Sequence, residues 1–94
     1  MTYLLVSNNV NQCPSGTRRI KAISECETAA RMLRLSDTSA EDDKQKGVSY
    51  DPPFCYFESG RLKFNVNGAN TGKCTSSDKC LCAKDGGGIF LLVA

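Results

Sequence analysis

The sequence predicts an α+β fold in which one short helix packs on a small antiparallel sheet and disulfides staple the domain. Residues 24–33 carry apolar side chains at helical spacing, and residues 55–66 read as two strands around a short turn. Six cysteines in 94 residues are an even number in a short chain, which is typical of a disulfide framework. With 40% hydrophobic residues the chain has too little apolar material for a second core, so we expect one domain over residues 1–94.

The helix is expected to begin at Ser24. The residues from Ser24 to Glu27 match the S-x-x-E capping box, in which each of the two side chains accepts a free backbone N–H. A stripe of small and apolar side chains then recurs at the spacing of one helix face: Cys26, Ala29, Ala30 and Leu33. This stripe turns Cys26 toward the core.

A β-hairpin is expected around Ser59-Gly60, which suits a two-residue turn. The strand after the turn alternates, so that its apolar side chains share one face: Leu62, Phe64 and Val66. Lys63 and Asn65 lie between them in the sequence and are expected to face water.

Two further strands are expected near the chain ends, at Tyr3–Val6 and Ile89–Val93. Both apolar runs are far too short to cross a bilayer, and the first residues lack the basic segment of a signal peptide. We therefore expect a mature product or an excised module without a membrane span. The two runs either pair with each other or present free edges to a partner.

Between the helix and the hairpin, residues 36–50 carry almost no large apolar side chain and include the acidic run from Glu41 to Asp43. We expect a long, exposed polar loop there. A recognition loop, or the bait loop of a protease inhibitor, is a second interpretation, but nothing in these residues identifies a protease.

The cysteines predict an oxidising compartment, either the extracellular space or an organelle lumen, because disulfides form and persist there. A zinc site is the alternative, with Cys74, Cys80 and Cys82 as candidate ligands. Their spacings, C-x5-C and C-x-C, fit no common zinc knuckle, and the chain has no histidine to complete one. We expect neither a metal nor another cofactor.

The composition argues against nucleic-acid binding and against catalysis. Twelve Lys+Arg against 10 Asp+Glu leave a net charge of only +2, well short of the basic excess typical of phosphate-backbone binding. The absence of histidine removes the commonest general base and the Ser-His and Cys-His arrangements. The acids of residues 41–43 are expected to be hydrated, and the C-x-C lacks thioredoxin-like spacing. We therefore expect that the protein is not an enzyme.

Four short segments between Cys13 and Cys82 form a recognisable order. They are Ile23 to Cys26, Ala29-Ala30 with Leu33, Pro52 to Tyr56, and Leu62 with Phe64-Asn65, followed by a closing cysteine. In this order they resemble a small cysteine-rich module that recurs in predicted secreted or lumenal proteins of dinoflagellates and other algae and protists. The resemblance implies no established activity. This chain differs from the module in having Phe54, where glycine is usual, and in having Cys74 and Cys80, which the module often lacks.

The residues alone do not determine the disulfide pairing, since six cysteines permit fifteen pairings. The comparison with the module implies one of them. Cys74 and Cys80 are expected to have been added together and to pair with each other. The remaining four form the framework shared with the module: Cys13, Cys26, Cys55 and Cys82. We expect Cys26–Cys55, which would pin the helix onto the hairpin, and Cys13–Cys82, which would draw the two ends together.

The expected function is that of a non-catalytic structural or interaction module, an accessory subunit or docking domain of a larger assembly. The resemblance allows a place on the lumenal side of an algal membrane complex, with peripheral membrane contact at most. The expected partners are other proteins. Candidate contact residues lie in the terminal runs, in a small basic cluster that includes Lys21, and among the tyrosines: Tyr3, Leu5, Arg18, Arg19, Tyr50, Tyr56, Phe90 and Leu92.

The alternative is a small secreted domain that binds a ligand or a carbohydrate. Aromatic and amide side chains suit sugars, and the candidates are Tyr50, Tyr56, Asn65, Asn67 and Asn70. Asparagine beside glycine is more often part of a turn, which is the simpler interpretation of these amides.

Overall fold

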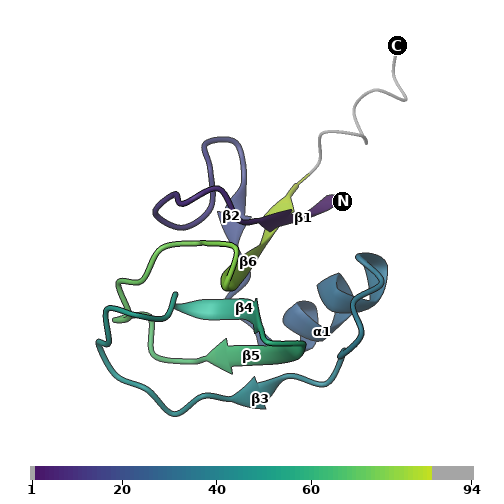
Figure 1. Cartoon of the computed structure of the whole chain (residues 1–94). Helices are drawn as coiled ribbons and strands as arrows, with labels where there is room; N and C mark the ends of the chain where they lie inside the picture. Colours follow the sequence, from purple (N-terminus) through teal and green to yellow (C-terminus); the bar gives the residue numbers. More distant parts are fainter. Residues whose placement is uncertain (1, 86–94) are drawn as a thin grey trace.

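The computed structural model describes residues 2–85. Along the chain they form β1 (Thr2–Val6), β2 (Arg18–Arg19), α1 (Ile23–Met32), β3 (Glu41–Asp42), β4 (Phe54–Glu58), β5 (Arg61–Asn65) and β6 (Asp78–Lys84). Figure 1 shows the one described helix beside one sheet, so the expected α+β fold is confirmed. No helix within residues 2–85 has the length and apolar character needed to cross a membrane.

The sheet is organised around β6, the longest strand. β1 pairs with one side of β6, and β4 and β2 pair with different parts of its other side, all antiparallel. β5 follows β4 through the hairpin, and β3 adds to the outside of β5. β3 runs parallel to β5 and is the one departure from the antiparallel pairing expected for the described sheet.

The core has two parts because successive residues of β6 point to opposite faces of the sheet. The face toward α1 buries the larger part: Ile20, Cys26, Ala29, Ala30, Cys55, Leu62, Phe64, Leu81 and Ala83. The opposite face buries a smaller cluster of Val6 and three cysteines, Cys74, Cys80 and Cys82. Three of the four buried residues in this second core are therefore disulfide-bonded cysteines rather than large apolar side chains.

All six cysteines form disulfides, and the three pairs are those expected: Cys13–Cys82, Cys26–Cys55 and Cys74–Cys80. The second of these joins α1 to β4 inside the larger core. The other two meet at β6 on the opposite face. The zinc interpretation is wrong because its three candidate ligands are all oxidised. Three disulfides indicate an oxidising environment.

α1 begins without the predicted capping box. The helix starts at Ile23, one residue before the predicted start, and its N-cap is Ala22, which makes no side-chain cap hydrogen bond. The Glu27 carboxylate instead accepts the backbone N–H of Ala40, at 2.8 Å, and so ties the following loop to the helix. The predicted stripe is confirmed, since the buried residues of α1 are its first three members.

The hairpin is confirmed, with Ser59 and Gly60 as its turn between β4 and β5. Both have positive φ, 51° and 76°, as in the type I′ turn that matches the twist of two strands. Two face assignments are wrong. Asn65 is buried, and its Oδ1 accepts the N–H of Asn67, which ends the strand in a turn. Val66 lies beyond that end and is 67% exposed.

Residues 36–50 are not a simple solvated loop. They contain β3, and the carboxylate of Asp37 accepts the backbone N–H of Leu62 at 2.9 Å. Lys63, expected to face water, is half-buried and donates to Glu41 of β3 at 2.9 Å. Polar side chains of this segment thus fasten it along the edge of β5, which apolar periodicity could not reveal.

Candidate functional site

The first candidate site is the outer edge of β1, the side of Thr2–Val6 that faces away from β6; we call it the β1 edge. Within residues 2–85 no strand pairs with it. Its five residues, TYLLV, include neither a charged residue nor a proline, which are the usual means of preventing an edge strand from pairing with another chain. The β1 edge therefore offers backbone donors and acceptors to an added strand.

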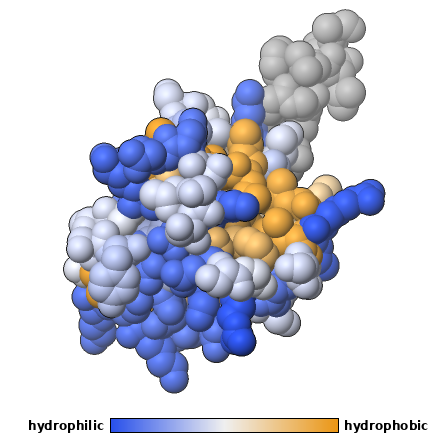
Figure 2. All heavy atoms as spheres, in the orientation of Figure 1, coloured by the Kyte–Doolittle hydropathy of each residue, from blue (hydrophilic) through white to orange (hydrophobic). Residues whose placement is uncertain are grey.

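An apolar surface adjoins the β1 edge on the face that carries α1. Leu5 lies opposite Leu81 of β6, and Phe57 of β4 lies opposite Lys79, two residues earlier in β6. Leu5 and Phe57 are half-buried and pack against the larger core. Figure 2 shows apolar surface over β1 and β6 and toward α1, whereas the end that carries β3 and β5 is mainly hydrophilic.

An ion-pair network holds one end of β1 in place. Arg18 donates to both carboxylate oxygens of Glu25, at 2.9 and 2.8 Å, and also pairs with Asp85. The hydroxyl of Tyr3 donates to the same Glu25 carboxylate at 3.1 Å. These bonds, chiefly those from Arg18, hold the pKa of Glu25 below its ordinary value. Two predicted contact residues, Tyr3 and Arg18, thus bind the same carboxylate. Arg18 is paired with two carboxylates, those of Glu25 and Asp85.

Two members of the basic cluster lie at the ring of Phe54. Arg19 and Lys21 lie 5.7 and 5.8 Å from the centre of its ring, within the range of cation–π contact. Phe54 has a φ of 64°, in the left-handed region that favours glycine. Arg18, Arg19 and Lys21 line one shallow hollow, but the charge of Arg18 is paired with Glu25 and Asp85.

The remaining predicted contact residues are dispersed. Tyr56 is fully buried, and its hydroxyl donates to the Asp43 carboxylate, so it cannot contact a partner. Burial and this hydrogen bond raise the pKa of Tyr56 above its ordinary value. Tyr50 is 67% exposed in the segment before β4. Phe90 and Leu92, with the rest of the predicted strand 89–93, lie outside the described residues.

The carbohydrate-binding set does not form a surface. Three of its five members, Tyr56, Asn65 and Asn70, are buried. The Asn70 amide donates to the Gln45 side chain and to the carbonyl of Pro52, at 3.2 and 3.3 Å. The Asn70 amide therefore links two segments that precede β4 and has no free groups to offer to a sugar.

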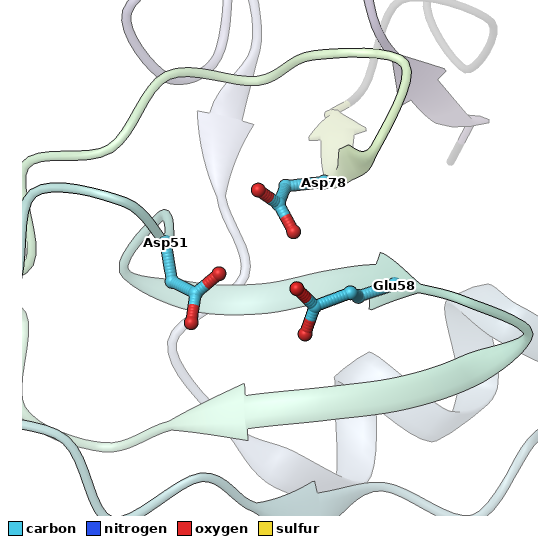
Figure 3. Close-up of side chains that lie close together, drawn as sticks. All are labelled: Asp51, Glu58 and Asp78. Atoms are coloured by element: carbon cyan, nitrogen blue, oxygen red, sulfur yellow. The ribbon is translucent and has the colours of Figure 1, made fainter.

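A second candidate site, not predicted from the sequence, consists of Asp51, Glu58 and Asp78, which we call the carboxylate trio. One oxygen from each side chain can be chosen so that all three lie within 4.8 Å of one another. Figure 3 shows the three carboxylates turned toward a common point from the loop before β4, the end of β4 and the start of β6. Glu58 and Asp78 are directly opposite across the β4–β6 pair.

Two carboxylates of the trio are almost completely buried, and the third, Glu58, is half-buried. Asp51 and Asp78 are only 4% and 8% exposed. Burial, followed by the neighbouring Glu58 carboxyl, raises the pKa of Asp78 to about 7. Within residues 2–85 none of the three carboxylates forms a salt bridge. The arrangement can take up a proton or coordinate a cation.

The acidic run of residues 41–43 differs from the trio in having a cation beside it. Glu41 and Asp43 flank the ammonium group of Lys63, at 2.9 and 4.0 Å, and Asp42 is exposed. Their charges are therefore partly balanced by a cation, unlike those of the trio.

The chain matches no protein-family model, none of the curated proteins and none of the solved structures with which it was compared.

Proposed function

We propose that this chain is a non-catalytic interaction module, an accessory subunit or docking domain of a larger assembly, and that it binds a partner protein by adding a strand of that partner to the β1 edge. The observation that carries the proposal is the β1 edge, with which no strand of residues 2–85 pairs. Five consecutive uncharged residues lie at the border of the described sheet, beside an apolar surface.

Strand addition draws affinity from backbone hydrogen bonds and specificity from alternate side chains. A strand added along β1 would place every second side chain on the face of Leu5, where an apolar residue would bury surface that is now half-open. Arg18, the cation nearest to β1 in the ion-pair network, is already paired with Glu25 and Asp85 and so has no free charge for an acidic residue of the partner. The fitting partner is thus an extended, apolar segment of another protein.

The disulfides support this function by making the docking strand rigid before binding. β1 pairs with β6 over its whole length, and β6 contributes Cys80 and Cys82 to two different disulfides. A strand held in this way loses little conformational freedom on binding, which reduces the entropic cost of association. The extracellular space or an organelle lumen is the setting we propose, and the algal resemblance favours the lumenal side of a membrane complex.

Tyr3→Lys is expected to weaken partner binding by about tenfold or more, because a lysine on an edge strand opposes strand addition. The lysine stem can cover the same apolar surface, and its ammonium group keeps an attraction to Glu25, so the fold is expected to survive. Tyr50→Lys is the matched control, since it makes the same exchange at a 67% exposed position away from β1. A partner captured from the native source by the wild-type chain would be titrated against each variant.

Amide hydrogen exchange of the complex provides the structural check. Binding should slow exchange of the amides of β1 that do not pair with β6. Equal affinity of the partner for Tyr3→Lys and the wild type, or protection that leaves the β1 amides unchanged, would contradict the proposal.

A further inference from the structure

We propose that the carboxylate trio of Asp51, Glu58 and Asp78 binds a calcium ion. The site lies on the face of the sheet opposite α1 and is separate from the β1 edge. It would join three segments: the loop before β4, the end of β4, and the turn closed by the Cys74–Cys80 disulfide.

The geometry suits a hard cation with oxygen ligands. Calcium takes oxygens at about 2.3–2.6 Å, so two ligands on opposite sides of the ion are separated by about 5 Å at most. The three chosen oxygens, all within 4.8 Å of one another, fall inside that limit. Magnesium requires shorter bonds of about 2.0–2.1 Å in strict octahedral geometry and gives up its water reluctantly. Calcium is therefore the better fit for a site open to solvent at the half-buried Glu58.

An independent observation points to a missing ligand. The Oδ1 atom of Asp78 is buried, has no hydrogen-bond partner, and belongs to a residue that is only 8% exposed. Figure 3 shows this carboxylate directed toward the other two. A buried carboxylate oxygen without a donor is costly, and two further carboxylates beside it increase that cost. A divalent cation would satisfy the oxygen and offset the repulsion together.

The surrounding residues hold the trio in position. Gln45 donates its amide to the carboxylate of Asp51 at 2.8 Å, and Gly72 donates its backbone N–H to the Asp51 carbonyl at 3.0 Å. Thr75 fixes the turn, because its hydroxyl accepts the N–H of Asp78 at 3.1 Å. Ligands that are already placed lose little freedom when an ion binds, so the site does not need to fold around it.

The affinity expected is that of an extracellular calcium module, with a Kd of roughly 0.1–1 mM. Three carboxylates supply the charge, while water must complete the coordination. Such an affinity matches the oxidising environment that the disulfides indicate, because extracellular modules with calcium sites of this strength work there.

Calcium chloride titration of the full, oxidised chain, followed by backbone amide NMR at pH 7.5, tests the proposal. Saturable shifts are expected at Asp51, Glu58 and Asp78, with a midpoint near that Kd, and at ten times the Kd the melting temperature should rise by about 5–10 °C. Magnesium chloride should bind about tenfold more weakly. Asp78→Asn, which preserves shape and removes one charge, should weaken calcium binding by about tenfold or more.

Asp42→Asn is the matched control, because it removes one acid of similar size from an exposed position and should leave calcium binding unchanged. Glu58→Gln is a second test at a half-buried ligand, in case Asp78→Asn alters the fold. The absence of saturable shifts up to ten times the expected Kd would overturn the proposal, as would equal calcium affinity of the wild type and a folded Asp78→Asn or Glu58→Gln variant. If the trio binds only a proton and no calcium, the titration will show no saturable shifts.

Discussion

Replacing both Cys26 and Cys55 by alanine is expected to lower the free energy of unfolding by about 3–4 kcal/mol. This disulfide closes a loop with a sequence separation of 29 and is the covalent link between α1 and the described sheet. Its removal frees the unfolded chain and leaves a gap at two positions that are 0% and 2% exposed. Urea unfolding at 25 °C, followed by circular dichroism, measures the change.

The matched control is the double alanine variant of Cys74 and Cys80, which removes another buried disulfide. Its loop has a sequence separation of only 6, so the chain-entropy contribution is smaller, about 2 kcal/mol. The reverse order of stabilities would show that loop closure is not the main contribution of the Cys26–Cys55 bridge.

Gly72→Ala is expected to destabilise the fold by roughly 2–3 kcal/mol. A Cβ at residue 72 would lie 2.4, 2.5 and 2.7 Å from backbone atoms of Asp51, which cannot rotate away as a side chain can. The two segments must separate, and the hydrogen bond from Gly72 N–H to the Asp51 carbonyl is strained or lost. Thermal unfolding monitored by circular dichroism gives the change in stability.

Gly68→Ala separates this steric effect from the general effect of losing a glycine. Its Cβ would also come close to another residue, at 2.6 Å, but the atom it meets is the end of the Phe54 ring, which can shift. A loss of well under 1 kcal/mol is expected. A Gly72→Ala variant as stable as Gly68→Ala would mean that the contact between residues 51 and 72 is looser than the structure shows.

Features determined by neighbouring residues were predicted well from the sequence. The buried stripe of α1 and the turn at Ser59-Gly60 depend on helical spacing and on turn chemistry, both of which are local. The capping box was wrong, because the helix begins at Ile23 and Ser24 is therefore not its N-cap; Glu27 instead accepts the N–H of Ala40, beyond the helix end. The disulfide pairs could not be derived from spacing alone, because six cysteines permit fifteen pairings and the partners lie on elements distant in sequence.

The carboxylate trio could not be predicted, since its members are separated in sequence and carry no motif. It exists because the β4–β6 register places Glu58 opposite Asp78, and because Gly72 lets the Asp51 backbone approach closely. The β1 edge was only partly predictable. An apolar strand at Tyr3–Val6 was expected, but its position at the border of the described sheet depends on pairing with β6, which is distant in sequence.

The disulfides allow a domain with so small a core to be stable, and both candidate sites depend on these disulfides. Cys80 and Cys82 anchor the strand that supports β1, and Cys74–Cys80 closes the turn that carries Asp78. A domain of this size buries too little surface for stability to be assured by packing alone, so covalent closure is expected to decide whether it folds.

The most direct test is the amide NMR spectrum of the wild-type chain after full reduction, with six free thiols verified by mass. We predict that the dispersed signals of the oxidised protein collapse to those of an unfolded chain at 25 °C. A reduced protein that keeps the native dispersion, without any metal ion to replace the bridges, would contradict the dependence of the fold on its disulfides.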